Sequence, residues 1–140
     1  MTKHLAVALV SVLVASGCKG PTDPSKNTTE TFTGTVQPLG TGDPLAHFTV
    51  SNTGEFTVSM TALTPGNVFV GIGWGLWSAN NCTLQQSNAV SSANIGKTAL
   101  SGQIQLKSDY CVIVFDPSLR FSGFPALTVA QNYTFQVSHP

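Results

Sequence analysis

The chain has 140 residues and a formal net charge of zero, because six basic side chains balance six acidic ones. Charged residues make up only 9% of the sequence, far below the share of about a quarter that is usual in soluble domains. This composition excludes the basic patch of a nucleic-acid-binding protein and a polybasic membrane stripe. Thr and Ser are abundant instead, so we expect the outward faces of the fold to be rich in hydroxyl groups.

An apolar run, Leu5–Ala15, follows the basic residue Lys3 near the start of the chain and is followed by two small residues. This layout is typical of a secretory signal peptide. The run is much shorter than the roughly 20 apolar residues that a transmembrane helix needs. We therefore expect residues 1–17 to be a signal peptide that is removed, and not a permanent membrane span.

Cys18 comes directly after Val14-Ala15-Ser16-Gly17, and this stretch resembles the lipobox of bacterial lipoproteins. That family most often has Leu three residues before the cysteine, where this chain has Ala15. The resemblance implies that the Cys18 thiol receives a diacylglyceryl group, that the leader is cut before it, and that the new amino group is acylated, for example with palmitate. Several acyl chains anchor a protein firmly, whereas one chain binds only marginally. The alternative is a cut elsewhere, which would leave Cys18 as a spare thiol.

The lipobox resemblance also implies a location in the bacterial cell envelope, with the membrane as a partner through the lipid. Lys19, in place of an Asp, follows the cysteine, and by resemblance to Gram-negative sorting rules this favours the outer membrane. Lys19–Thr29 contains two prolines and small polar residues but no large apolar side chain. We therefore expect residues 18–29 to be a lipidated N-terminus and a flexible linker.

Cys82 and Cys111 are the two other cysteines of the chain. In an exported protein such an even pair predicts a disulfide. Closing a loop of about 30 residues should restrict the unfolded chain by about 3 to 4 kcal/mol. The alternative, a metal site, has no companion ligands at a suitable spacing, because His47 and His139 lie far away in the sequence.

From Glu30 onward the apolar residues recur every second position, which is typical of β-strands. Strands are expected over residues 30–37, 45–51, 55–62, 67–77, 103–107, 110–116 and 132–139. Strands 45–51 and 55–62 flank the turn Asn52-Thr53-Gly54 and are predicted to pair as a hairpin. Ala62 and Leu106 are expected on inward faces. Residues 78–102 are predicted to be mainly loop, with short strands near 83–86 and 97–100.

Residues 67–77 form the most apolar segment after the leader, which predicts a central strand covered on both sides. One face carries Phe69, Gly71, Gly73, Gly75 and Trp77. Three alternate glycines leave room for another backbone, a large side chain or a ligand. Two interpretations remain open. In one, a loop or an aromatic side chain of the opposing sheet fills the face; in the other, Phe69 and Trp77 bound a shallow platform for a sugar ring or a peptide.

Several aromatic strands together resemble the bacterial pre-peptidase C-terminal domain and its stand-alone lipoprotein relatives, in strand order and aromatic placement. These are Glu30–Val36, His47–Val50, Phe56–Met60, Tyr110–Asp116 and Tyr133–Val137. The resemblance spans residues 30–140 and implies a jelly-roll-like module, generally without catalytic residues. Helical periodicity is absent after residue 17, so we expect an all-β, antiparallel β-sandwich of about eight short strands.

Some relatives of that domain bind calcium through acidic residues, but this chain has Val68-Phe69-Val70-Gly71-Ile72-Gly73 in the corresponding region. The acidic residues near turns, Asp43, Asp109 and Asp116, are interpreted as turn formers. We therefore predict no metal site and no cofactor.

A catalytic constellation needs a nucleophile, a base and a group that orients the base, and no such set is visible. His47 and His139 are interpreted as ordinary surface histidines, and the acidic residues are scattered. We expect a membrane-anchored structural or interaction module, not an enzyme, with a protein or glycan partner. The alternative is an accessory domain that presents the aromatic and glycine face to a glycan or peptide; a hydrolase ranks third.

Overall fold

A computed structural model describes residues 23–140 of the chain. The predicted signal peptide and residues 18–22, which include Cys18 and the first part of the predicted linker, lie outside the described residues. Within residues 23–140, no helix has the length and apolar character needed to span a membrane. The helices there are three single 3-10 turns, η1 (Pro24–Lys26), η2 (Ser92–Asn94) and η3 (Pro117–Leu119).

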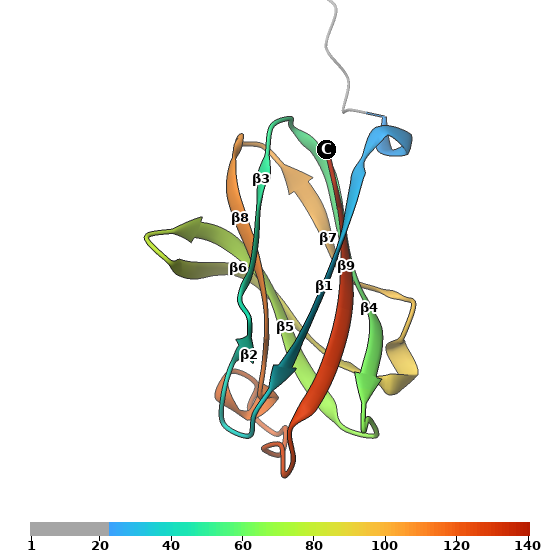
Figure 1. Ribbon diagram of the computed structural model, residues 1–140, viewed down its shortest axis with the longest axis vertical. Coiled ribbons are helices and arrows are strands. Elements are labelled where there is room, and N and C mark those ends of the chain that lie inside the picture. Colours follow the sequence, from blue (N-terminus) through green and yellow to red (C-terminus); the bar gives the residue numbers. More distant parts are fainter. Residues whose placement is uncertain (1–22) are drawn as a thin grey trace, which may run out of the picture.

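Nine strands form two antiparallel sheets that face each other, which confirms the predicted β-sandwich (Figure 1). The five-stranded sheet has the order β2 (Gly42–Asp43), β1 (Thr28–Val36), β9 (Gln131–His139), β4 (Gly54–Thr64) and β7 (Thr98–Ile104). The four-stranded sheet has the order β3 (Ala46–Val50), β8 (Ser108–Phe115), β5 (Phe69–Ser78) and β6 (Asn81–Ser91). Strand β1 begins at Thr28, slightly ahead of the predicted start at Glu30.

The pairing of the strands is that of one long hairpin rolled into two sheets. β1 pairs with β9, β3 with β8, β4 with β7, and β5 with β6. When the short strand β2 is left aside, the first strand pairs with the last, the second with the second last, and so on. This is the jelly-roll arrangement. The predicted jelly-roll-like fold is therefore confirmed.

The core lies between the sheets and is built from the inward positions of nearly every strand. Its largest fully buried side chains include Met60, Ile72 and Phe135. At its centre the Trp74 ring stacks on Phe56 and on Tyr110, with ring centroids 3.9 Å and 4.9 Å away. Burying such aromatic side chains stabilises the fold by about 1.5–3 kcal/mol each.

The predicted hairpin between residues 45–51 and 55–62 is wrong. Strand β3 pairs with β8, whereas β4 pairs with β7 and β9, so the turn at residues 52–53 carries the chain from one sheet to the other. A turn signal shows that the chain reverses direction, but it does not show in which sheet the next strand lies.

Residues 78–102 hold β6 and most of β7, where the sequence predicted mainly loop with short strands near 83–86 and 97–100. The residues between β5 and β6, Ala79 and Asn80, have φ angles of 49° and 60°, which suit a tight hairpin turn. β6 is polar because it is an edge strand with much of its length in solvent. Its pairing with β5, and not an apolar pattern of its own, makes it a strand.

Two side chains predicted to face inward do not. A β-bulge in the pairing of β4 with β9 falls between Met60 and Ala62, so the alternation shifts by one residue. Ala62 is exposed and Leu63 is buried in its place. β7 ends at Ile104, and Leu106, in the connection that follows, is 65% exposed.

Candidate functional site

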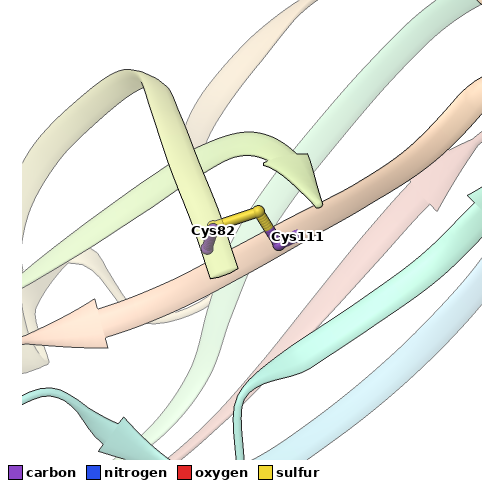
Figure 2. Close-up of a disulfide and its surroundings, with 2 residues drawn as sticks. All are labelled: Cys82 and Cys111. Atoms are coloured by element: carbon purple, nitrogen blue, oxygen red, sulfur yellow. A yellow bond between two sulfur atoms is a disulfide. The ribbon is translucent and has the colours of Figure 1, made fainter. Parts of the chain in front are cut away.

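The predicted disulfide between Cys82 and Cys111 is present, with a Cα–Cα distance of 5.8 Å (Figure 2). Cys82 lies on β6 and Cys111 on β8, and β5 runs between these strands in the sheet order. Strands two positions apart are separated by about 9.6 Å in a regular sheet. The end of the β5–β6 hairpin must therefore bend toward β8, and the bulge between Trp74 and Gly75 in the β5–β6 pairing provides that bend.

Side chains and backbone of the neighbouring strands cover the predicted glycine face. A Cβ atom at Gly71 would collide with the ring of Phe115 on β8. At Gly73 it would lie 2.7 Å from a methyl group of Leu84 on β6, and at Gly75 it would meet the carbonyl of Thr83. The glycines are therefore buried, and strands of the same sheet, not the opposing one, fill the space.

Only the ends of the predicted face stay accessible. Phe69 is 45% exposed and contacts the Phe124 ring edge-on, with centroids 5.2 Å apart. Trp77 is half-buried and lies parallel to the His47 imidazole, 4.5 Å away. His47 pairs with Cys111 across β3 and β8, so this aromatic pair lies beside the disulfide.

His139 is not a surface residue, contrary to the interpretation from the sequence. It is only 4% exposed, its Nε2 lies 2.9 Å from Oε1 of Glu30, and its ring stacks on Phe48 with a centroid distance of 4.8 Å. The inward alternation of Tyr133, Phe135 and Val137 continues to this residue. Extending that alternation by one step would have found it.

Asp116 is fully buried and organises one end of the sandwich. Its carboxylate accepts hydrogen bonds from the backbone N–H groups of Leu39, Leu127 and Ser118 and from the Ser118 hydroxyl, at 2.7–3.0 Å. Burial alone would raise the pKa of Asp116, but these hydrogen bonds outweigh it and hold the pKa below its usual value. The β1–β2 connection and two parts of the β8–β9 connection are joined at this carboxylate.

Asp109 and Asp43, the other acidic residues near turns, both belong to the strand framework. Asp109 accepts a 2.6 Å hydrogen bond from the Thr49 hydroxyl, and Asp43 belongs to the short strand β2. Within residues 23–140, no three His, Cys, Asp or Glu side chains gather in a group that could hold a metal ion.

A cleft that the sequence did not reveal opens between the two sheets, where the edge strands β6 and β7 approach each other. Its volume is about 200 Å³, and we call it the inter-sheet cleft. It is lined by Trp74, Leu76, Gln85, Gln103, Gln105, Leu106 and Tyr110. A larger hollow of about 370 Å³ lies over β1, β9 and β4, and four of its eight lining residues are threonines.

Comparison with known proteins gives no family. No protein-family model matches the chain, and a search of curated proteins finds no similar sequence. Among solved structures, one titled "Crystal structure of PirA" is similar with a TM-score of 0.38 and 10% identity, over 88% of this chain and 99% of that one. A likeness at this level assigns neither a family nor a function.

Proposed function

We propose that the chain is a lipid-anchored protein of the bacterial cell envelope, whose jelly-roll domain is a non-catalytic structural or interaction module. The observation that carries this proposal is the disulfide between Cys82 and Cys111, in a domain that follows the lipobox-like stretch Val14–Cys18. Disulfides persist in oxidising compartments, so the bond supports export from the cytoplasm. Cys18 then supplies the anchor, and Lys19 favours the outer membrane.

The use of the charged side chains supports a non-catalytic role. Asp116 holds loops together, and Glu30 binds His139. The carboxylate of Glu55 accepts a 3.2 Å hydrogen bond from the Gln103 amide. These groups are occupied with contacts that fix strands and loops to one another.

The position of the anchor would also decide which end of the domain is nearer to the membrane. Thr28 pairs with His139, so the start of β1 and the end of β9 lie side by side at one end of the sandwich (Figure 1). The loops joined by Asp116 lie at the other end. A lipid at Cys18 would keep the first end nearer to the membrane and the Asp116 loops farther from it.

Membrane partition of a Cys18→Ser variant tests the anchor. We expect the wild-type protein to enter the detergent phase in a phase-separation assay and to incorporate radiolabelled palmitate, and the variant to do neither. A Cys111→Ser variant is the matched control, because it loses the disulfide but keeps Cys18. If Cys18→Ser partitions with membranes as strongly as wild type, the anchor proposal is wrong.

A second candidate function is an accessory domain that binds a glycan or a peptide. The accessible rings of Phe69 and Trp77 at the ends of the covered glycine face favour it. Stacking on Trp77 would require the ligand to use the side that His47 leaves open. Loss of binding in Trp77→Ala, with binding retained in Thr31→Ala, is the expected result on a glycan array; equal binding by both variants would remove this face from consideration.

A further inference from the structure

The inter-sheet cleft combines an apolar floor with amide side chains at its rim. The indole of Trp74 is held between Phe56 and Tyr110 and is only 3% exposed, so its position is fixed by the core and only a small part of it borders the cleft. Leu76 and Leu106 add apolar surface beside it. Apolar surface with a few placed polar groups is the usual composition of a small-molecule site.

Three glutamines supply the polar groups, and the fold positions them in different ways. Gln85 is the extra residue of the bulge in β6, between Leu84 and Gln86, and such bulges re-aim a side chain. Gln103 donates through its amide nitrogen to Glu55, so its orientation is set. Gln105 lies in the short connection from β7 to β8.

The connection that carries Gln105 is itself held in place. The Tyr110 hydroxyl donates a 2.9 Å hydrogen bond to the backbone carbonyl of Leu106. This bond ties the rim of the cleft to a ring that is buried in the core. The cleft is therefore largely formed before any ligand arrives, which lowers the entropic cost of binding.

The lining also defines the chemistry of a ligand. None of the seven side chains that line the cleft is charged. Glutamine amides both donate and accept hydrogen bonds, which matches hydroxyl groups. The volume of about 200 Å³ is below the range of about 300–1,000 Å³ of drug-sized sites, so it suits one ring rather than an extended peptide.

We propose that the inter-sheet cleft binds one neutral, hydroxyl-bearing sugar ring, with its apolar face toward Leu76 and Leu106 and its hydroxyls toward the three glutamines. This proposal deepens the interaction-module function and rests on it, but it does not depend on the lipid anchor. It places the ligand site on the edge of the sandwich, away from the covered glycine face.

Fluorescence of Trp74 reports on the cleft directly. The chain has two tryptophans, so a Trp77→Phe background leaves Trp74 as the single indole. The full chain is purified in a zwitterionic detergent, because a sugar-headed detergent would compete. The probes are the methyl pyranosides of glucose, galactose, mannose and N-acetylglucosamine. We expect a saturable change in Trp74 emission for at least one of them, in the millimolar range typical of so small a ligand.

Two variants and one control locate the binding. Gln85→Ala and Gln105→Ala should each weaken binding several-fold. Gln136→Ala should leave it unchanged, because Gln136 is exposed on the outer face of the five-stranded sheet. Circular dichroism before titration shows that each variant is folded.

The proposal is overturned if none of the four glycosides gives a saturable change, or if both cleft variants bind as tightly as the control. A response to a leucine-rich peptide without a response to any glycoside also overturns it, in favour of a peptide ligand. Each of these failures leaves the membrane partition of Cys18 variants unaffected, so the anchor proposal is judged separately.

Discussion

Glycines serve opposite faces in the two sheets. In the five-stranded sheet, Gly34 and Gly42 leave room on the inner face, where the hydroxyl of Tyr133 lies against both. In the four-stranded sheet, Gly71, Gly73 and Gly75 leave room on the outer face, which the neighbouring strands fill. In the five-stranded sheet, the glycines thus make room for a core side chain. In the four-stranded sheet, they let neighbouring residues pack on the outer face.

The remaining outer surfaces follow this difference. Thr31 and Thr33 of the five-stranded sheet are exposed, and Thr35 donates a 2.7 Å hydrogen bond to Asn132 on the next strand. The outer face of the four-stranded sheet carries the disulfide and the stacked pair of His47 and Trp77. The five-stranded sheet has a wet hydroxyl face, whereas the two central strands of the four-stranded sheet, β5 and β8, are packed on both sides.

The largest effect should come from removing the covalent link on the packed outer face. The double variant Cys82→Ala, Cys111→Ala opens a link with a sequence separation of 29 residues and should lower the free energy of unfolding by about 3–4 kcal/mol. Urea unfolding measures it, with reduced wild type as the matched control. A loss below about 1 kcal/mol would mean that strand pairing alone holds the β5–β6 hairpin against β8.

Two glycine variants compare a rigid neighbour with a flexible one. Gly75→Ala places a methyl group against the Thr83 carbonyl and should cost about 3 kcal/mol, because backbone must shift. Gly73→Ala meets only the end of the Leu84 side chain and should cost about 1 kcal/mol. Thermal unfolding of both variants measures the difference. Equal losses of stability in the two variants would show that the β6 backbone at Thr83 shifts as easily as the Leu84 side chain.

Alkaline titration examines the inner face of the five-stranded sheet. Burial, with the negative charge of Asp43, raises the pKa of Tyr133 to about 12. Above pH 10 the unfolded chain releases this proton while the folded protein retains it, so stability falls as pH rises. The expected loss is about 1 kcal/mol between neutral pH and pH 11.

The variant Tyr133→Phe isolates this contribution, because Tyr110 is present in both proteins. Its stability should decline less steeply between pH 9 and 11 in urea unfolding. Identical slopes for variant and wild type would show that the Tyr133 hydroxyl ionises in the folded protein at its ordinary pKa.

The smallest effect is expected on the wet face. Thr31→Val keeps the β-branched shape and removes only an exposed hydroxyl, so the free energy of unfolding should change by less than about 0.5 kcal/mol. Urea unfolding of Thr31→Val and of Gly73→Ala under the same conditions measures this change in the free energy of unfolding. A loss as large as that of Gly73→Ala would show that the hydroxyl face also carries packing energy.

The sequence predicted the fold class, because alternation is strong wherever one strand face is buried. Phe56, Val58 and Met60, for example, are all buried as expected. It failed at β6, whose polar residues suit an exposed edge, and at the β3–β4 connection, where the partner strands are distant in sequence. Ala62 was wrongly predicted to face inward, because the β-bulge before it changes the apolar pattern only at the next residue, Leu63.

The candidate site was predictable only in part. The Cys82–Cys111 pair follows from counting cysteines, and the special role of the glycine strand follows from its pattern. Which atoms fill the space at Gly75 depends on the bend of the β5–β6 hairpin, which no local pattern encodes. The inter-sheet cleft joins Gln85 to Gln103 and Gln105 only because the two sheets meet there, so sequence reasoning could not assemble it.

The antiparallel pairing of β1 with β9 determines how the domain would respond to force. Thr28 and His139 are opposite each other, so tension between them peels the hydrogen bonds of this strand pair one after another, beginning beside the contact of Glu30 with His139. Tension between Thr28 and the loops at Asp116 runs along β1 instead and loads the whole row of hydrogen bonds at once. A domain anchored at Cys18 would yield readily when pulled from its C-terminal strand and would resist a load applied at its far end.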